Sequence, residues 1–116
     1  MSNIGNFSPD VGNELNIKGY HFLNTSLPLN SYPNKFPKFE KVNEIGIGKI
    51  YTLRLFVKLP SAGIGMIESG LLDVKVISKS KKGFIGVIQT LLPDTFPISK
   101  GQNIEIKKEE ILYEQI

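Results

Sequence analysis

Residues 49–59, KIYTLRLFVKL, alternate between two kinds of side chain along their length. One face of this stretch carries only apolar and aromatic residues, namely Tyr51, Leu53, Leu55, Val57 and Leu59. A two-residue period built from branched and aromatic side chains is typical of a β-strand with one buried face. Pro60 lacks a backbone donor and is expected to end the strand. The stretch therefore predicts a strand at the centre of the fold.

Four more strands are expected downstream of this one. They are LLDVKVIS at 71–78, FIGVIQTLL at 84–92, NIEI at 103–106 and ILYEQI at 111–116. Turn-forming residues separate them, which favours short antiparallel connections. Residues 107–116 also contain Glu, Lys and Leu, so a last helical turn is an alternative there. We predict a mainly β protein, all-β or β-rich α+β: a small antiparallel, partly open barrel or sandwich of about five to seven short strands with at most one short helix.

Residues 1–48 differ from residues 49–116 in character. Residues 27–39 are rich in proline, which excludes a continuous helix or a central strand. Residues 12–23, GNELNIKGYHFL, show an alternation that breaks at Gly19, and we interpret them as a bulged or edge strand. We expect one domain over 1–116, in which 1–48 packs on or straps a β-core formed by 49–116.

Composition limits the class of protein. A chain of 116 residues fits one domain, and its 14 basic and 11 acidic residues leave a net charge of only +3. With no cysteine, the chain has neither a disulfide framework nor a thiolate zinc site. No apolar run is long enough for a membrane span, and the start lacks the features of a secretory signal. We expect a soluble cytoplasmic protein that does not associate with membranes.

The sequence shows no catalytic apparatus. Its one histidine, His21, lies between aromatic residues and has no visible partner, which is more typical of a packed or surface residue than of a catalyst. Residues 44–50, EIGIGKI, do not have the spacing of a phosphate-binding loop. We therefore predict no enzyme, no cofactor and no metal site. A pocket with carboxylates converging on His21 would reopen the question.

Two segments carry apolar side chains where polar loop residues are usual. The connection at 59–70 contains Ile64, Met66 and Ile67, and the proline-rich segment contains Tyr32, Phe36 and Phe39. Such residues either fold back over the core or contact a partner protein. Both readings stay open, and these six residues are the candidate partner-binding residues.

The segment SKSKKG at 78–83 suggests a basic finger. Its candidate nucleic-acid-binding residues are Lys75, Lys79, Lys81 and Lys82. Small barrels that bind single strands pair a basic groove with stacking aromatics, and here Phe84 alone lies beside the lysines. The alternative is a solvated hairpin turn in which Gly83 supplies a permissive backbone.

From about Tyr51 to Tyr113 the order of features resembles the YegJ-like family of uncharacterised small bacterial β-rich proteins. RLFVKLP, ESGLLDVKVIS and GVIQTLLPDTFPISKGQNIEI carry the resemblance, with Glu68, Gly86 and Pro93 among the fitting positions. The histidine and tryptophan usual after the glutamate are replaced here, since Ser69 and Gly70 follow it. The resemblance implies a small barrel-like β fold and, through the common occurrence of related sequences near toxin and immunity genes, protein inhibition.

These observations favour a non-catalytic protein-binding module, for instance an inhibitor or immunity-type protein that masks another protein. Two alternatives remain: a small-barrel nucleic-acid-binding protein that uses the hairpin at 75–82, and a structural or accessory phage protein.

Overall fold

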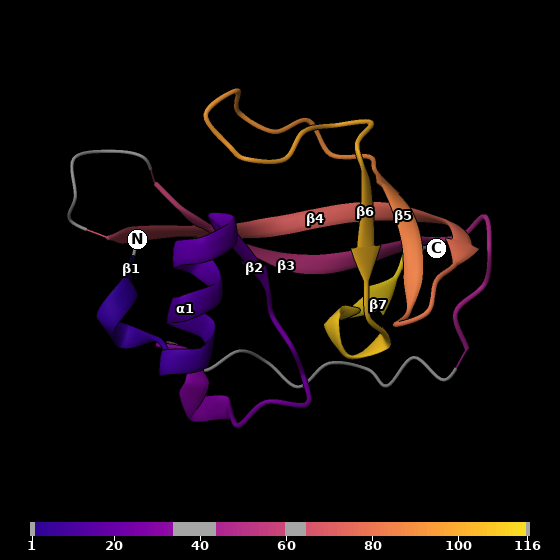
Figure 1. Cartoon of the computed structure of the whole chain (residues 1–116). Helices are drawn as coiled ribbons and strands as arrows, with labels where there is room; N and C mark the ends of the chain where they lie inside the picture. Colours follow the sequence, from indigo (N-terminus) through magenta and orange to yellow (C-terminus); the bar gives the residue numbers. More distant parts are fainter. Residues whose placement is uncertain (1, 34–43, 60–64, 116) are drawn as a thin grey trace.

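A computed structural model of the chain describes residues 2–33, 44–59 and 65–115. Its elements, in order, are β1 (Ser2–Asn3), η1 (Ile4–Asn6), α1 (Pro9–Lys18), β2 (Tyr20–Phe22), η2 (Leu29–Ser31), β3 (Ile50–Lys58), β4 (Met66–Lys79), β5 (Phe84–Ile88), β6 (Asn103–Ile106), η3 (Lys108–Glu110) and β7 (Tyr113–Glu114). Figure 1 shows a long β3–β4 ribbon with α1 at one end and β5 and β6 crossing it at the other. The predicted fold class is confirmed.

The strands form one antiparallel sheet with the order β2-β3-β4-β5-β6. The two-residue strands β1 and β7 extend it beside β4 and β3. The register runs from Ile50 opposite Lys75 to Lys58 opposite Ile67. A shift between Val76 and Ser78 lets β4 bend toward β5, and the sheet curls into a half-barrel.

The predicted alternation in β3 places its side chains on two buried faces. Tyr51, Leu53, Leu55 and Val57 fill the concave side of the sheet with residues from β4, β5 and β6. The pattern predicts one buried face, yet Phe56 on the opposite face is buried too. A strand at the centre of the fold can be covered on both sides because α1 packs over one end of the convex face.

The prediction for residues 12–23 is wrong: this segment is mostly helical. Ser8 Oγ accepts the Val11 N–H and so caps the first turn, and Pro9 occupies the first helical position. Gly19, at φ 82°, ends α1 in the left-handed conformation that glycine favours, and it is not a strand bulge. The only strand here is the three-residue β2.

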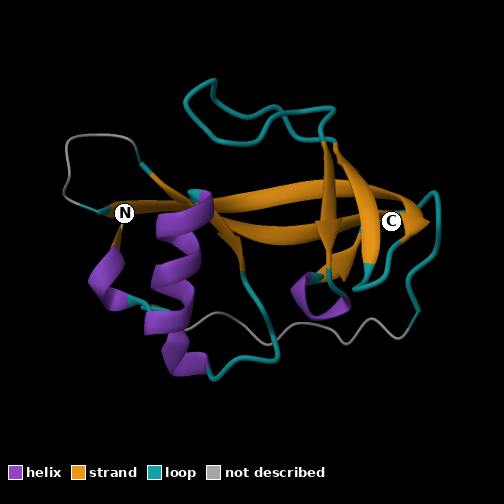
Figure 2. Ribbon diagram, in the orientation of Figure 1, coloured by secondary structure: helices purple, strands orange, loops and turns teal. Residues whose placement is uncertain are grey.

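Helix α1 closes a second core. Its two buried side chains, Val11 and Leu15, pack with Phe56, Ile67 and residues from four other segments, which are Phe7, Leu23, Tyr32 and Leu112. Figure 2 shows the helical segments on one side of the β3–β4 ribbon and the loop at 89–102 on the other. The described part of 1–48 is therefore built into the fold.

Three further boundaries differ from the prediction. β5 ends at Ile88, four residues before the end of the strand predicted at 84–92. Residues 66–70, expected in a loop, begin β4, because a nine-residue ladder with β3 continues through them. Residues 107–115 form the 3-10 turn η3 followed by β7, so both alternatives for this segment are partly present. No helix among the described residues is long and apolar enough to cross a bilayer.

Candidate functional site

A cleft of about 330 Å³ lies where the half-barrel remains open. Its walls come from α1, from the β2 segment and from the β6–η3 segment. Strands β2 and β6 are the two ends of the strand order in the sheet. One end of this opening is bridged by Thr25, whose N–H and Oγ1 both donate to Glu109 O at 2.8 and 2.7 Å. Its size falls at the lower end of the range for ligand pockets.

The cleft concentrates negative charge. Four of its lining residues are carboxylic acids, namely Asp10, Glu14, Glu105 and Glu110, whereas two are lysines, Lys18 and Lys107. Lys18 Nζ lies 3.5 Å from Glu14 Oε1, so one ammonium group already has a carboxylate partner. The chain as a whole carries a net positive charge. The acidic character is therefore a local property of this opening.

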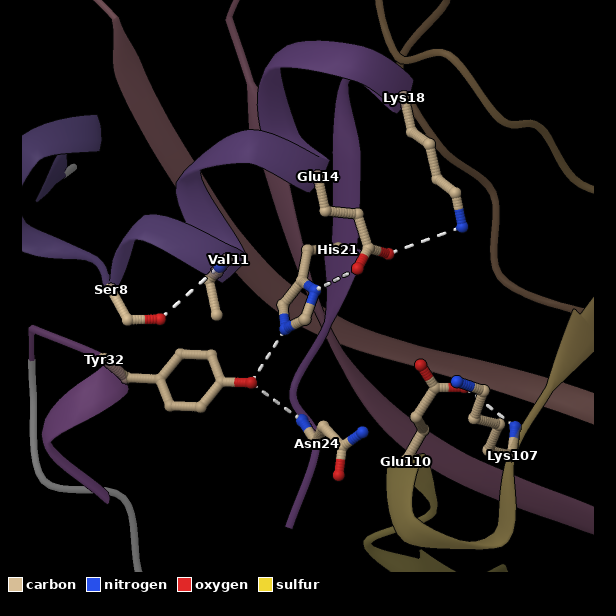
Figure 3. A network of polar contacts seen from close by, with 9 residues as sticks. All are labelled: Ser8, Val11, Glu14, Lys18, His21, Asn24, Tyr32, Lys107 and Glu110. Atoms are coloured by element: carbon tan, nitrogen blue, oxygen red, sulfur yellow. Dashed lines mark hydrogen bonds and ion pairs between the residues drawn. The ribbon is translucent and has the colours of Figure 1, made fainter. Parts of the chain in front are cut away.

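His21 lies on the cleft wall within a buried network (Figure 3). The side chain of this residue, which is 3% exposed, places Nε2 2.7 Å from Tyr32 Oη. Tyr32 Oη also accepts the Asn24 N–H at 2.9 Å. The rings of His21 and Tyr32 both stack on Phe56. The network ties β2, η2 and β3 together, and burial raises the pKa of Tyr32 to about 12.

The other ring nitrogen of His21 faces Glu14. Nδ1 and Glu14 Oε2 are 3.3 Å apart, but the alignment is poor for a hydrogen bond, and Nδ1 has no hydrogen-bond partner among the described atoms. Burial lowers the pKa of His21 below 6.5, although the Glu14 carboxylate opposes this effect. We assign the neutral tautomer in which Tyr32 donates to Nε2 and the ring proton on Nδ1 faces Glu14.

Glu110 holds the opposite wall of the cleft. Its Oε1 accepts the Lys107 N–H at 2.7 Å, which closes the first turn of η3. Burial raises the pKa of Glu110 above 4.5, while this hydrogen bond and the Lys107 charge oppose the rise. A cation placed in the cleft would therefore stabilise a carboxylate that is now partly desolvated.

The structure places one carboxylate, that of Glu14, beside the lone histidine, and three more acidic residues line the same cleft. The sequence contained little signal for this arrangement. Glu14 and Lys18 form an i, i+4 pair that is usual on a solvated helix face, and Glu105 and Glu110 are more than eighty residues away from His21.

Three of the six predicted partner-binding residues, Tyr32, Met66 and Ile67, lie in the part of the chain that the structure describes. Tyr32 and Ile67 belong to the second core and are 6% and 2% exposed, because a ring network and the β1–β4 and β3–β4 pairing enclose them. Met66 is half-buried at the start of β4. Ile64, Phe36 and Phe39 lie outside the described residues.

The predicted basic finger is the hairpin between β4 and β5. Its residues Lys75, Lys79, Lys81 and Lys82 are all exposed. Phe84, the neighbouring aromatic, packs against the core instead of standing beside them as a stacking platform. Within residues 2–33, 44–59 and 65–115, no group of three His, Cys, Asp or Glu side chains is arranged to hold a metal ion.

Comparisons of the chain with family models, with curated proteins and with solved structures found no match.

Proposed function

We propose that the protein is a cytoplasmic, non-catalytic protein-binding module whose cleft between α1, β2 and β6 receives a cationic part of its partner. The observation that supports this most strongly is the gathering of four carboxylic acids in one opening of a chain with a net charge of +3. Opposite charges across an interface steer association and select the partner.

The walls of the cleft suit a lysine or arginine side chain. Glu14 on α1 and Glu105 on β6 supply carboxylates to the cleft, and Tyr20 and Phe22 also line it. An alkyl or guanidinium group can lie along aromatic surface while its charge reaches a carboxylate. A bidentate arginine contact would be favoured where both oxygens of one carboxylate are accessible.

Binding explains this cleft better than catalysis does. Its lining contains no serine, threonine or cysteine, so it offers no hydroxyl or thiol nucleophile apart from the Tyr20 phenol. The Nε2 atom of His21 is engaged by Tyr32, and its ring is buried. A general base needs to reach the proton of a bound substrate, and here Nε2 points to a residue of the core.

An inhibitor or immunity-type role fits the same geometry. Surfaces that bind nucleic acid carry clustered lysine and arginine side chains. A small protein with an acidic cleft can cover such a surface and compete with the phosphate backbone for it. Interfaces of this kind owe much of their on-rate to charge.

The test uses two seven-residue peptides, one alternating Lys and Val and one alternating Glu and Val. We expect the Lys peptide to shift the amide NMR signals of β2 and β6, with an affinity that falls as salt is added. Glu14→Gln and Glu105→Gln should each weaken binding about fivefold, or about 1 kcal/mol. Glu68→Gln, at an exposed site on β4 outside the cleft, is the matched control. Equal binding of both peptides, or wild-type affinity in both cleft variants, would refute the proposal.

A further inference from the structure

The two strands that border the cleft each have a free edge. At the two ends of β2, Leu23 N donates to Arg54 O and Lys58 N donates to Gly19 O, both at 2.9 Å. These bonds make Tyr20 and Phe22 the non-hydrogen-bonded partners of β3 in this antiparallel ladder. The N–H and C=O groups of Tyr20 and Phe22 therefore point away from β3, toward the opening.

The same reasoning applies to β6 on the other side. Ile88 N donates to Gln102 O at 3.0 Å, so Val87 opposite Asn103 is a non-hydrogen-bonded pair. Two residues further along β6, Glu105 opposite Ile85 is again a non-hydrogen-bonded pair. The peptide groups of Glu105 thus point away from β5, and no hydrogen bond joins them to another described residue.

Along β2 and β6, apolar side chains point to one face of the sheet and polar side chains point to the other. Tyr20 and Phe22 contact the apolar cluster inside the half-barrel, as do the β6 residues Ile104 and Ile106. His21 and Glu105 alternate with them and point to the other face of the sheet. A strand placed between β2 and β6 would meet apolar surface on one face and carboxylates on the other.

We infer that the partner of the proposed binding module enters this cleft as an extended strand in which apolar and basic residues alternate, pairing its backbone with the edges of β2 and β6. The inference rests on the proposed function and adds the conformation and sequence pattern of the ligand. Strand addition supplies affinity through main-chain hydrogen bonds and specificity through alternate side chains. A partner strand would thereby complete the half-barrel.

Charge favours a partner strand over a second copy of this chain. Copies meeting at this edge would bring Glu105 near the carboxylates of a second cleft, and like charges on adjacent strands oppose pairing. A basic strand meets opposite charge at the same position.

The test compares the alternating Lys–Val peptide with the same peptide N-methylated at its valines. N-methylation removes backbone donors and leaves every side chain and charge in place. We expect it to weaken binding at least tenfold, and we expect only the unmethylated peptide to slow hydrogen exchange of the Phe22 and Glu105 amides.

A pair of protein variants separates backbone from charge. Glu105→Pro and Glu105→Gln both remove the carboxylate, but only proline also removes the N–H that faces the cleft, a change that edge strands tolerate. Thermal unfolding verifies that both variants fold. We expect proline to weaken peptide binding at least fivefold more than glutamine does.

The outcomes separate this inference from the proposed function. Equal binding of the two peptides, or equal effects of the two variants, overturns strand pairing and leaves a cleft for cationic groups. Absence of binding by either peptide at low salt overturns both proposals. Protection of the Phe22 and Glu105 amides that rises with protein concentration alone identifies a second copy as the occupant and overturns the partner strand.

Discussion

The hydroxyl group of Tyr32 links three segments of the chain through hydrogen bonds. It lies 2.7 Å from His21 Nε2 and accepts the Asn24 N–H at 2.9 Å. Tyr32→Phe removes this oxygen and retains the ring, which stacks on Phe56 with centroids 5.4 Å apart. We therefore expect a loss of folding free energy that comes from hydrogen bonding alone.

The size of the loss follows from the two hydrogen bonds. Each contributes about 1 kcal/mol net, and leaving the buried Nε2 of His21 without a donor adds about 1 kcal/mol more. The free energy of unfolding at pH 7 should fall by about 2–3 kcal/mol. For a domain of this size that corresponds to a decrease in Tm of about 10 °C.

Alkaline pH provides a second measure of the same group. Burial raises the pKa of Tyr32 from 10 to about 12, so between these values the folded protein retains a proton that the unfolded chain loses. Stability of the wild type must then fall as the pH rises through this window, by about 2 kcal/mol, whereas Tyr32→Phe has no such proton. The difference in the free energy of unfolding between the wild type and Tyr32→Phe should therefore shrink as the pH rises.

Urea unfolding followed by circular dichroism measures both effects at pH 7, 10 and 11.5. Tyr113→Phe is the control, because Tyr113 is 37% exposed and a surface change of this kind costs less than about 0.5 kcal/mol. A Tyr32→Phe cost below about 0.5 kcal/mol at pH 7 would refute the role of the network. A gap that stays constant from pH 10 to 11.5 would refute the protonation argument.

Three further predictions concern the core and the cleft. Gly86→Ala would place a methyl group onto Val74 Cγ1 in the packed core and should lower the free energy of unfolding, measured in urea, by about 2–3 kcal/mol. Gly101→Ala, at φ 87° in open space, should lower it by about 1 kcal/mol. Equal losses in the two variants would contradict the packing argument. Burial lowers the pKa of His21, so below pH 6.5 the unfolded chain takes up a proton more readily than the folded chain does. The free energy of unfolding should therefore fall on acidification, and it should fall less steeply with pH in His21→Gln. Equal slopes in the two proteins would contradict this. Glu110→Gln retains an acceptor for the Lys107 N–H but removes a partly desolvated charge. The free energy of unfolding at pH 7 should therefore be unchanged or raised by about 1 kcal/mol, while binding of the Lys–Val peptide weakens. A large loss of stability would contradict the burial argument.

The β-core could be predicted from sequence because its signal is local. In β3 a two-residue period runs for nine residues and ends near a proline, and the shorter strands repeat that pattern. Helix α1 was missed because two side chains, Val11 and Leu15, carry its buried face. Its start and end signals at Ser8, Pro9 and Gly19 were present, but the glycine was interpreted as a bulge.

The candidate site could not be predicted because no single segment contains it. His21 is in β2, and Glu14 is one turn from the end of α1. Glu105 is in β6 and Glu110 ends η3, both far along the chain from His21. The sequence points to His21 and to carboxylates converging on it as the arrangement that would reopen the question of catalysis. The cleft depends on the curl of the sheet, which brings β6 round toward β2, and a residue pattern does not reveal that curvature.

The acidity of the cleft gives a physical reason why the half-barrel stays open. Closing it would require β2 and β6 to pair directly, and this would press Glu105 toward the Glu14 carboxylate beside the buried ring of His21. Both carboxylates would lose water, and the neutral His21 supplies no charge to compensate them. The same charges that prevent the two edges from pairing with each other, or with another copy, are compensated when a lysine or arginine lies between them. In the proposed complex, the charges that protect a free strand edge also select the strand that occupies it.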